Sequence, residues 1–210
     1  VDSNVERSIR YDANLAAEGG PRAKVTLTYH NRSDGPLIAC VQEARYESSY
    51  ADMMDGCYWD FVRVYVPAGS RLLQGPELLL PPGSLLARHS KVVPHRPILS
   101  ARTEGDRQVW AAFFALAPGE ERTLAFEYQL PPAVLEPGAD GLIHYRLLVT
   151  KQPGTVAVPL QAQFILPSGA EAVSAKPVDL LWEWGAALMV STNLRTDRTL
   201  ELVFRVPGKP

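Results

Sequence analysis

Residues 120–131 read EERTLAFEYQLP, and residues 196–207 read TDRTLELVFRVP. In both stretches, apolar side chains alternate with side chains that are mostly small, polar or charged. Successive side chains of a β-strand point to opposite faces, so this pattern predicts a half-buried strand. The two stretches share Arg-Thr-Leu near the start and a proline at the end. Each follows an apolar segment and a short polar turn, which predicts a hairpin in both places.

The similarity between the two halves of the chain extends upstream in the same order. FVRVYVPAGS (61–70) is similar to QFILPSGA (163–170), because both are strand-like and both contain Pro-x-Gly near their end. Further strand-like stretches precede them, AKVTLTYHN (23–31) and IHYRLLVTKQPG (143–154). This repeated order predicts an all-β fold of two tandem immunoglobulin-like antiparallel β-sandwiches.

We expect the boundary between the two sandwiches in PPAVLEPGADG (131–141), which is rich in proline and glycine and lacks periodicity. The first β-sandwich, with long loop insertions, then covers 1–131, and the second, smaller one covers 132–210. The alternative is one larger sandwich that spans the chain. The Pro-rich insertion at about 71–97 has few charges for a free linker, so we expect its leucines to pack on the first sandwich.

Composition and motifs exclude several classes of function. The net charge of −2 gives no strong attraction to nucleic acid or to an anionic membrane surface. No apolar run reaches the roughly 18 residues that span a bilayer. The sequence has no G-x-G-x-x-G, Walker A or G-x-S-x-G motif. We therefore expect no nucleic-acid partner, no cofactor and no enzymatic activity.

The two cysteines, Cys40 and Cys57, lie in the stretch ACVQEARYESSYADMMDGCYWD (39–60). Their spacing suits a disulfide, whose closed loop would stabilise the fold by about 3 kcal/mol in the chain-entropy model. Two buried, inert thiols on neighbouring strands are the alternative. The spacing does not match a thioredoxin-type pair, and no histidine lies close enough in sequence to suggest a zinc site.

The same stretch supplies the candidate binding residues. Rigid aromatic rings give recognition loops a large contact area at low entropic cost, which favours Tyr46, Tyr50 and Tyr58 as contacts for a partner. Asp52 and Asp55 add acidic groups to the set. Packing of the tyrosines against the protein itself is the alternative. The acidic residues do not follow the spacing of an EF-hand loop, so we expect no metal.

Two further features have both a functional and a structural interpretation. In the stretch WEW, alternation places Trp182 and Trp184 on one face of a strand. They are either core anchors or a flat aromatic platform that stacks sugar rings. Asn31-Arg32-Ser33 matches the pattern of a glycosylation acceptor.

The segments FVRVYVPAGSRLL, RTLAFEYQLP and YRLLVTKQPGT resemble the C-terminal region of a bacterial family of envelope proteins that is catalogued as a domain of unknown function. The resemblance covers the whole chain. It implies a protein with one N-terminal membrane anchor, a large extracytoplasmic region and a β-rich C-terminal part. An extracytoplasmic location would favour the disulfide. The resemblance implies no catalytic residue.

These observations lead to one functional expectation. The chain is expected to be a non-catalytic extracytoplasmic structural or protein-interaction module, associated with the cell envelope. The alternative is a carbohydrate-binding module that recognises cell-wall or surface glycan. The expected partner is therefore a protein or glycan at the cell surface, and the membrane is contacted only through an anchor outside this chain.

Overall fold

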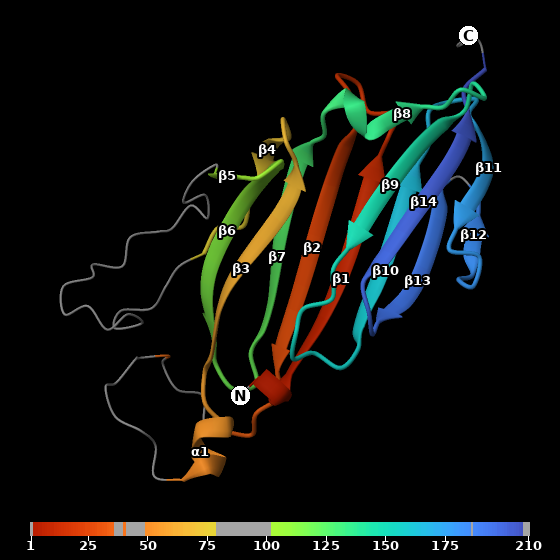
Figure 1. The fold of residues 1–210 in the computed structure, drawn as a ribbon. Helices are drawn as coiled ribbons and strands as arrows, with labels where there is room; N and C mark the ends of the chain where they lie inside the picture. Colours follow the sequence, from red (N-terminus) through yellow and green to blue (C-terminus); the bar gives the residue numbers. More distant parts are fainter. Residues whose placement is uncertain (1, 36–39, 41–48, 79–101, 186, 208–210) are drawn as a thin grey trace. The chain divides into compact units, whose positions relative to one another are not determined.

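The computed structural model describes residues 2–35, 40, 49–78, 102–185 and 187–207. These residues fold mainly into β-strands, as the alternation predicts (Figure 1). The strands are β1 (Val5–Asn14), β2 (Arg22–Asn31), β3 (Tyr58–Pro67), β4 (Arg71–Gln74), β5 (Arg102–Glu104), β6 (Arg107–Leu116), β7 (Glu121–Gln129), β8 (Leu135–Pro137), β9 (Ile143–Val149), β10 (Val158–Ile165), β11 (Glu171–Lys176), β12 (Trp182–Trp184), β13 (Leu188–Leu194) and β14 (Arg198–Arg205). The helical turns are η1 (Asp2–Asn4), α1 (Tyr50–Met54) and η2 (Pro132–Val134). No described helix combines the length and the apolar character that a membrane span requires.

The strands form three sheets. Their orders are β12-β13-β10-β1-β2-β7-β4, β11-β14-β9-β8 and β3-β6-β5. Within the strands, burial alternates as expected: in β7 the side chains of Leu124, Phe126 and Tyr128 are buried, whereas Thr123, on the opposite face, is exposed. The predicted all-β sandwich architecture is confirmed.

The sheet neighbours in the first half of the chain recur in the second half when seven is added to each strand number. The run β1-β2-β7-β4 corresponds to β8-β9-β14-β11, and β3-β6-β5 corresponds to β10-β13-β12. The two Arg-Thr-Leu stretches lie on the equivalent strands β7 and β14. The two strands that lead into Pro-x-Gly are the equivalent pair β3 and β10. A duplication predicts this correspondence, and a single larger sandwich does not require it.

The prediction of a hairpin before each Arg-Thr-Leu stretch, from β6 and β7 and from β13 and β14, is wrong. β6 and β7 follow each other in the chain but belong to different sheets, and so do β13 and β14. The turn before β7 is tight: Glu120 N donates to Ala117 O at 3.0 Å, and Gly119 has a φ of 74°. Alternation indicates which face of a strand is buried, but it does not identify the neighbouring strand, and here the chain changes sheet at the turn.

The pair of β1 and β10 is parallel, although the sequence was interpreted as antiparallel throughout. β1 runs parallel to β10, in register from Ile9 opposite Leu160 to Asn14 opposite Ile165. The connectivity also differs from a constant-type immunoglobulin domain, whose sheets have the orders A-B-E-D and C-F-G. In each copy here, the fifth and seventh strands have exchanged sheets.

Spatial contacts divide the chain into two compact units. Unit 1 comprises Val1–Ser8, Leu27–Val66 and Gln74–Ala125, and unit 2 comprises Ile9–Thr26, Pro67–Leu73 and Phe126–Pro210. The division expected at residue 131 assigned residues 9–26 and 67–73 to the first sandwich. The structure groups them with the second half of the chain, because β1, β2 and β7 each contribute residues to both units.

Each unit has an aromatic cluster in its core. In unit 1, the rings of Tyr29 and Phe114 meet edge to face, with centroids 4.9 Å apart. In unit 2, the hydroxyls of Tyr11 and Tyr145 share a buried hydrogen bond of 2.6 Å beside Phe164. Burial raises the pKa of Tyr145 to about 12 and raises the pKa of Tyr11 well above its ordinary value.

Candidate functional site

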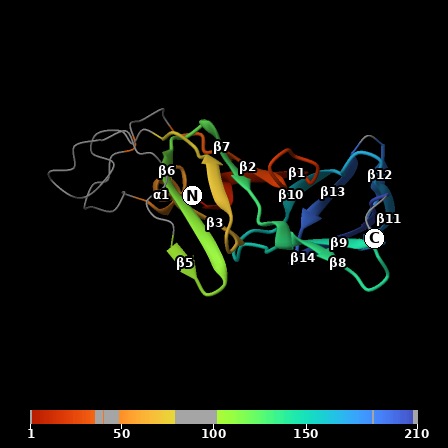
Figure 2. The ribbon, with the colours of Figure 1, turned by 90° about the horizontal axis from the view of Figure 1, so that it is seen from above.

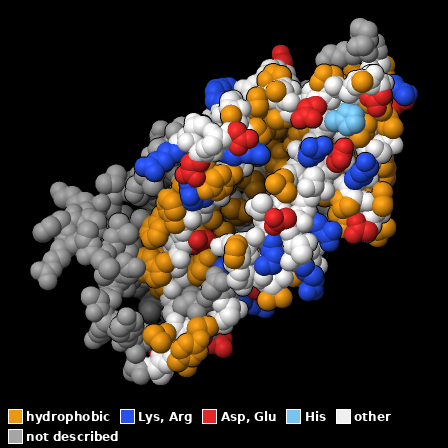
Figure 3. All heavy atoms as spheres, viewed as in Figure 1, with side chains coloured by type: hydrophobic (Ala, Val, Ile, Leu, Met, Phe, Trp, Pro, Cys, Tyr) orange, Lys and Arg blue, Asp and Glu red, His pale blue; other side chains and the backbone are white. Residues whose placement is uncertain are grey.

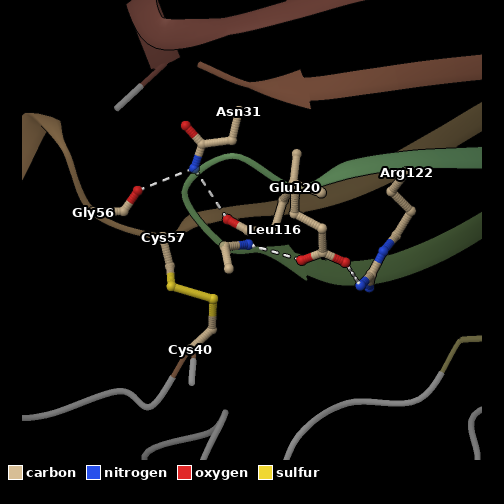
Figure 4. Close-up of a disulfide and its surroundings, with 8 residues drawn as sticks. Asn31, Cys40, Gly56, Cys57, Leu116, Glu120 and Arg122 are labelled. Carbon is tan, nitrogen blue, oxygen red and sulfur yellow. Dashed lines mark hydrogen bonds and ion pairs between the residues drawn. A yellow bond between two sulfur atoms is a disulfide. The ribbon is translucent and has the colours of Figure 1, made fainter. Parts of the chain in front are cut away.

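A disulfide joins Cys40 to Cys57, whose Cα atoms are 5.7 Å apart (Figure 4). Cys57 immediately precedes β3, so the bridge fixes the entry of the chain into that strand. No cysteine in the described part of the chain is free. The disulfide predicted from the sequence is therefore confirmed, and the alternative of two separate thiols is wrong.

Beside the disulfide, the fully buried side chain of Asn31 connects three segments (Figure 4). Its amide nitrogen donates to the carbonyl oxygens of Gly56 and Leu116, at 3.2 Å in each case. Its amide oxygen accepts a 3.2 Å hydrogen bond from the backbone N–H of Ser33. A glycan on this nitrogen would be incompatible with its burial and its two hydrogen bonds in the folded chain, so the match of residues 31–33 to an acceptor pattern has a structural explanation instead.

The turn between β6 and β7 is attached to the same point. Asn31 N donates to Glu120 O at 3.0 Å, and Gly119 N donates to Asn31 O at 2.8 Å. The Glu120 side chain accepts a 2.9 Å hydrogen bond from Ala117 N and forms an ion pair with Arg122. Backbone and side-chain bonds together therefore hold this turn against Asn31, whose amide in turn reaches Gly56 at the base of the disulfide-closed loop.

The described end of that loop carries helix α1. Ser49 caps the helix, because its Oγ accepts a 3.1 Å hydrogen bond from Asp52 N. The same Oγ donates to the Asp52 carboxylate at 2.8 Å. Tyr50 is 74% exposed and Met53 is 38% exposed. The helix thus presents one aromatic and one flexible apolar side chain to solvent.

A second polar clamp holds the far end of α1. Asn4 Nδ2 lies within hydrogen-bond distance of Met54 O at 3.2 Å, Asp55 Oδ1 at 3.1 Å and Ser33 Oγ at 3.3 Å. Gly35 lies so close that a Cβ added to it would be 2.4 Å from Asp55 O. The helix is therefore fixed to the N-terminal segment and to the residues after β2.

Tyr58 lies in the core of unit 1. Arg7 donates to its hydroxyl at 2.9 Å, and the Arg7 guanidinium lies 5.2 Å from the ring centroid. The ring also stacks against Tyr29 and meets Phe114 edge to face. Burial raises the pKa of neighbouring Asp60, although a hydrogen bond from Tyr58 and the charge of Arg7 act in the opposite direction.

The predicted binding residues that the structure describes lie in different surroundings. Tyr50 and Asp52 both lie on α1, where Tyr50 is exposed and Asp52 takes part in the cap. Asp55 is half-buried and its Oδ1 is bonded to Asn4, whereas Tyr58 is buried in the core. Tyr46 lies outside the described residues.

Several residues that build the site were missed in the sequence. The spacing of Ser49 and Asp52 fits a capping box with aspartate in place of glutamate, which would have indicated the helix. The long-range bonds of Asn4 and Asn31 have no local signal, because Met54 and Leu116 lie far away in sequence. The Pro-rich segment expected to cover the first sandwich falls mostly in 79–101, outside the described residues.

The two tryptophans of the proposed aromatic platform differ in their surroundings. Trp182 packs on Phe164, with centroids 6.2 Å apart, and its Nε1 donates to Pro177 O at 3.2 Å. Trp184 is 55% exposed. They therefore do not form an exposed row of two rings.

Unit 2 has a surface pocket of about 350 Å³ on the outer face of β1, β2, β7 and β10. Most of its side chains are polar, and none belongs to the predicted binding set. The lining residues are Asp12, Ala13, Asn14, Ala17, Arg22, Ala23, Lys24, Glu127, Gln163 and Ile165. Among the residues that the structure describes, no group of three or more His, Cys, Asp or Glu side chains is placed to hold a metal ion.

No protein-family model and no curated protein matches the chain. Among solved structures, it is similar to an M1 zinc metallopeptidase from Deinococcus radiodurans, with 13% identity and a TM-score of 0.39. It is also similar to a variant of a two-domain M1 zinc metallopeptidase bound to L-tryptophan, with 14% identity and a TM-score of 0.39. These alignments cover 96% of this chain and 42% and 43% of the two structures. The chain thus spans less than half their length, and a similarity this low has no bearing on activity.

Proposed function

We propose that this chain is a non-catalytic, extracytoplasmic module of a bacterial cell-envelope protein, and that it binds another protein through the disulfide-anchored loop. The observation that carries the proposal is the arrangement of α1. Exposed Tyr50 and Met53 are presented by a helix whose surroundings are fixed by a disulfide and two buried or half-buried asparagines.

The fixed base of the loop supports a role in recognition. A side chain that is already held in place loses less conformational entropy on binding than one on a free loop. Tyrosine adds a large amphipathic ring with few rotatable bonds, and methionine adapts to irregular apolar surfaces. The scaffold strands supply the rigidity and the loop supplies the contact, which is a common division in β-sandwiches.

The disulfide also supports the proposed location. Structural disulfides persist in oxidising compartments and are rare where thiol reductants are abundant. The resemblance of the strand and turn segments to envelope proteins also implies an extracytoplasmic location. An anchor outside residues 1–210 would then supply the attachment to the membrane.

The carbohydrate-binding alternative has less support. Binding modules of that kind need exposed aromatic faces against which sugar rings stack, and Trp182 is occupied by its contact with Phe164. Of the two tryptophans of the proposed platform, Trp184 alone remains available. We therefore keep glycan binding only as a second arm of the test.

The test is site-specific photo-crosslinking in cells that export the chain to the envelope. A photoreactive amino acid replaces Tyr50 in one variant and Val156, which is 80% exposed in unit 2, in the control. Cross-links to one protein at position 50, and none at position 156, are expected. In parallel, the purified chain and Trp184→Ala are tested for sedimentation with purified cell-wall glycan.

The outcomes separate the two candidates. No cross-link at position 50, or equal cross-linking at both positions, would contradict the proposed protein-binding site. Sedimentation with glycan that is lost in Trp184→Ala would favour the carbohydrate-binding alternative. Free thiols in the exported chain, detected by alkylation and mass spectrometry, would contradict the proposed location.

A further inference from the structure

β3 is a ten-residue strand at the edge of its sheet. Its one neighbour among the strands of the described residues is β6 (Figure 2 shows β6 with β5 on its other side). The equivalent strand of the second copy is β10, and there the corresponding edge is occupied by β1. No strand of the described residues occupies this edge of β3, and such an edge can pair with a further strand.

The outward face of β3 carries large side chains at alternate positions. Phe61 and Tyr65 are each 50% exposed, and half-buried Trp59 stacks on Phe113 of β6 with centroids 6.3 Å apart. Arg63 lies over the Tyr65 ring at 5.1 Å. Figure 3 shows hydrophobic side chains gathered over β3 and β6. An apolar face beside an open edge is a combination that soluble proteins usually avoid unless it is an interface.

Arg63 is held in position within the sheet. Its guanidinium forms an ion pair with Glu104 of β5, and the Tyr65 hydroxyl donates to the same carboxylate at 3.2 Å. An approaching strand therefore meets two exposed aromatic rings and the guanidinium that lies over one of them. This combination fits a partner strand that also carries aromatic and cationic side chains, and β3 itself has that composition.

We propose that β3 pairs with β3 of a second copy of this chain, antiparallel and with the two-fold axis at Val62. In that register Trp59 faces the second copy's Tyr65, and Phe61 faces the second copy's Arg63. Aromatic pairs and cation–π pairs across neighbouring strands are both stabilising. The two-fold axis repeats each contact, which gives the closed, isologous interface typical of homodimers.

The neighbouring registers are less favourable. With the axis at Arg63, the two arginines face each other, and like charges in this position destabilise the pair. With the axis at Phe61, the ladder loses two residues, because pairing extends over 58–64 rather than 58–66. The register at Val62 also leaves Pro67, which has no N–H to donate, outside the paired range.

The test uses two variants of one exposed position and measures self-association of the oxidised chain by sedimentation velocity, from low micromolar to several hundred micromolar. Phe61→Lys places a lysine opposite Arg63 twice in the dimer. Phe61→Glu removes the same ring but places a carboxylate opposite Arg63. Circular dichroism spectra and melting curves show whether each variant folds like the wild type.

We expect a reversible monomer–dimer equilibrium for the wild type. Phe61→Lys should raise the dimer dissociation constant by about tenfold or more, and Phe61→Glu should dimerise at least as tightly as the wild type. The double variant Phe61→Lys/Arg63→Glu should regain the association that Phe61→Lys loses. A wild type that stays monomeric throughout overturns the proposal, and so does equal weakening by both single variants. The surface differs from α1, so neither result depends on the protein-binding role proposed for Tyr50.

Discussion

The replacement Asn31→Ala is expected to destabilise unit 1 severely. The side chain is fully buried, and its loss leaves Gly56 O, Leu116 O and Ser33 N without their bonds to the amide. Each unsatisfied buried group costs about 1–3 kcal/mol, and water can reach only the partly buried Gly56. We expect a loss of about 3–5 kcal/mol in the free energy of unfolding.

The assay is equilibrium unfolding in urea under oxidising conditions, followed by far-UV circular dichroism and tryptophan fluorescence. A background in which Trp182 and Trp184 are phenylalanine leaves Trp59 and Trp110 as reporters, and both lie in unit 1. Asn193→Ala is the matched control, because Asn193 is exposed on β13 and should change stability by less than about 0.5 kcal/mol.

A second variant tests the reason for the loss. Asn31→Asp keeps the shape of the side chain but replaces the donating NH₂ with an oxygen that faces two carbonyl oxygens. It should cost at least as much as alanine near neutral pH and recover in part in acid, where a protonated carboxyl can donate one bond. A loss below about 1 kcal/mol for Asn31→Ala would refute the reasoning, because the three groups would then be satisfied in another way.

Three further outcomes are expected. Gly35→Ala should cost about 1–3 kcal/mol, because its Cβ would lie 2.4 Å from Asp55 O, whereas Gly56→Ala, with no contact closer than 3.6 Å, should cost less in the same urea assay. Burial raises the pKa of Tyr145 above its unfolded value, so the folded state keeps a proton that the unfolded state loses. The melting temperature should therefore fall as pH rises above about 10, and less steeply in Tyr145→Phe. Reduction of the disulfide should lower the free energy of unfolding by about 3 kcal/mol, and an unchanged melting temperature in reductant would contradict this.

Alternation located strands well because burial of one face is a local property of a strand. The stretches around β7 and β14 show this, since their apolar positions are the ones that the structure buries. The same signal contains nothing about the strand that lies alongside. No sequence signal therefore indicated that the chain passes to another sheet before β7 and before β14. Nor did any signal indicate that β1 and β10 pair in parallel.

The candidate site was harder to predict because its residue types have two uses. Tyr58 has the composition of a recognition residue, but distant Arg7 and Tyr29 make it part of the core. Asn31 matches a glycosylation pattern, but distant Leu116 makes it a buried link. Cys40 and Cys57 were the exception, because a short loop between two cysteines restricts the geometry enough to favour a bridge.

The parallel pair of β1 and β10 also has a consequence for biosynthesis. Arg10 and Gln163, which are hydrogen-bonded on that pair, are 153 residues apart in sequence. Ribosomes add about 5–20 residues per second, so the edge of β1 that meets β10 waits roughly 8–30 s for its partner to be made. During that time β2 can cover one side of β1 while the other side stays open to aggregation. The edge of β1 is thus completed only after β10 has been made, and we expect this protein to need a chaperone that holds β1 until β10 has been translated.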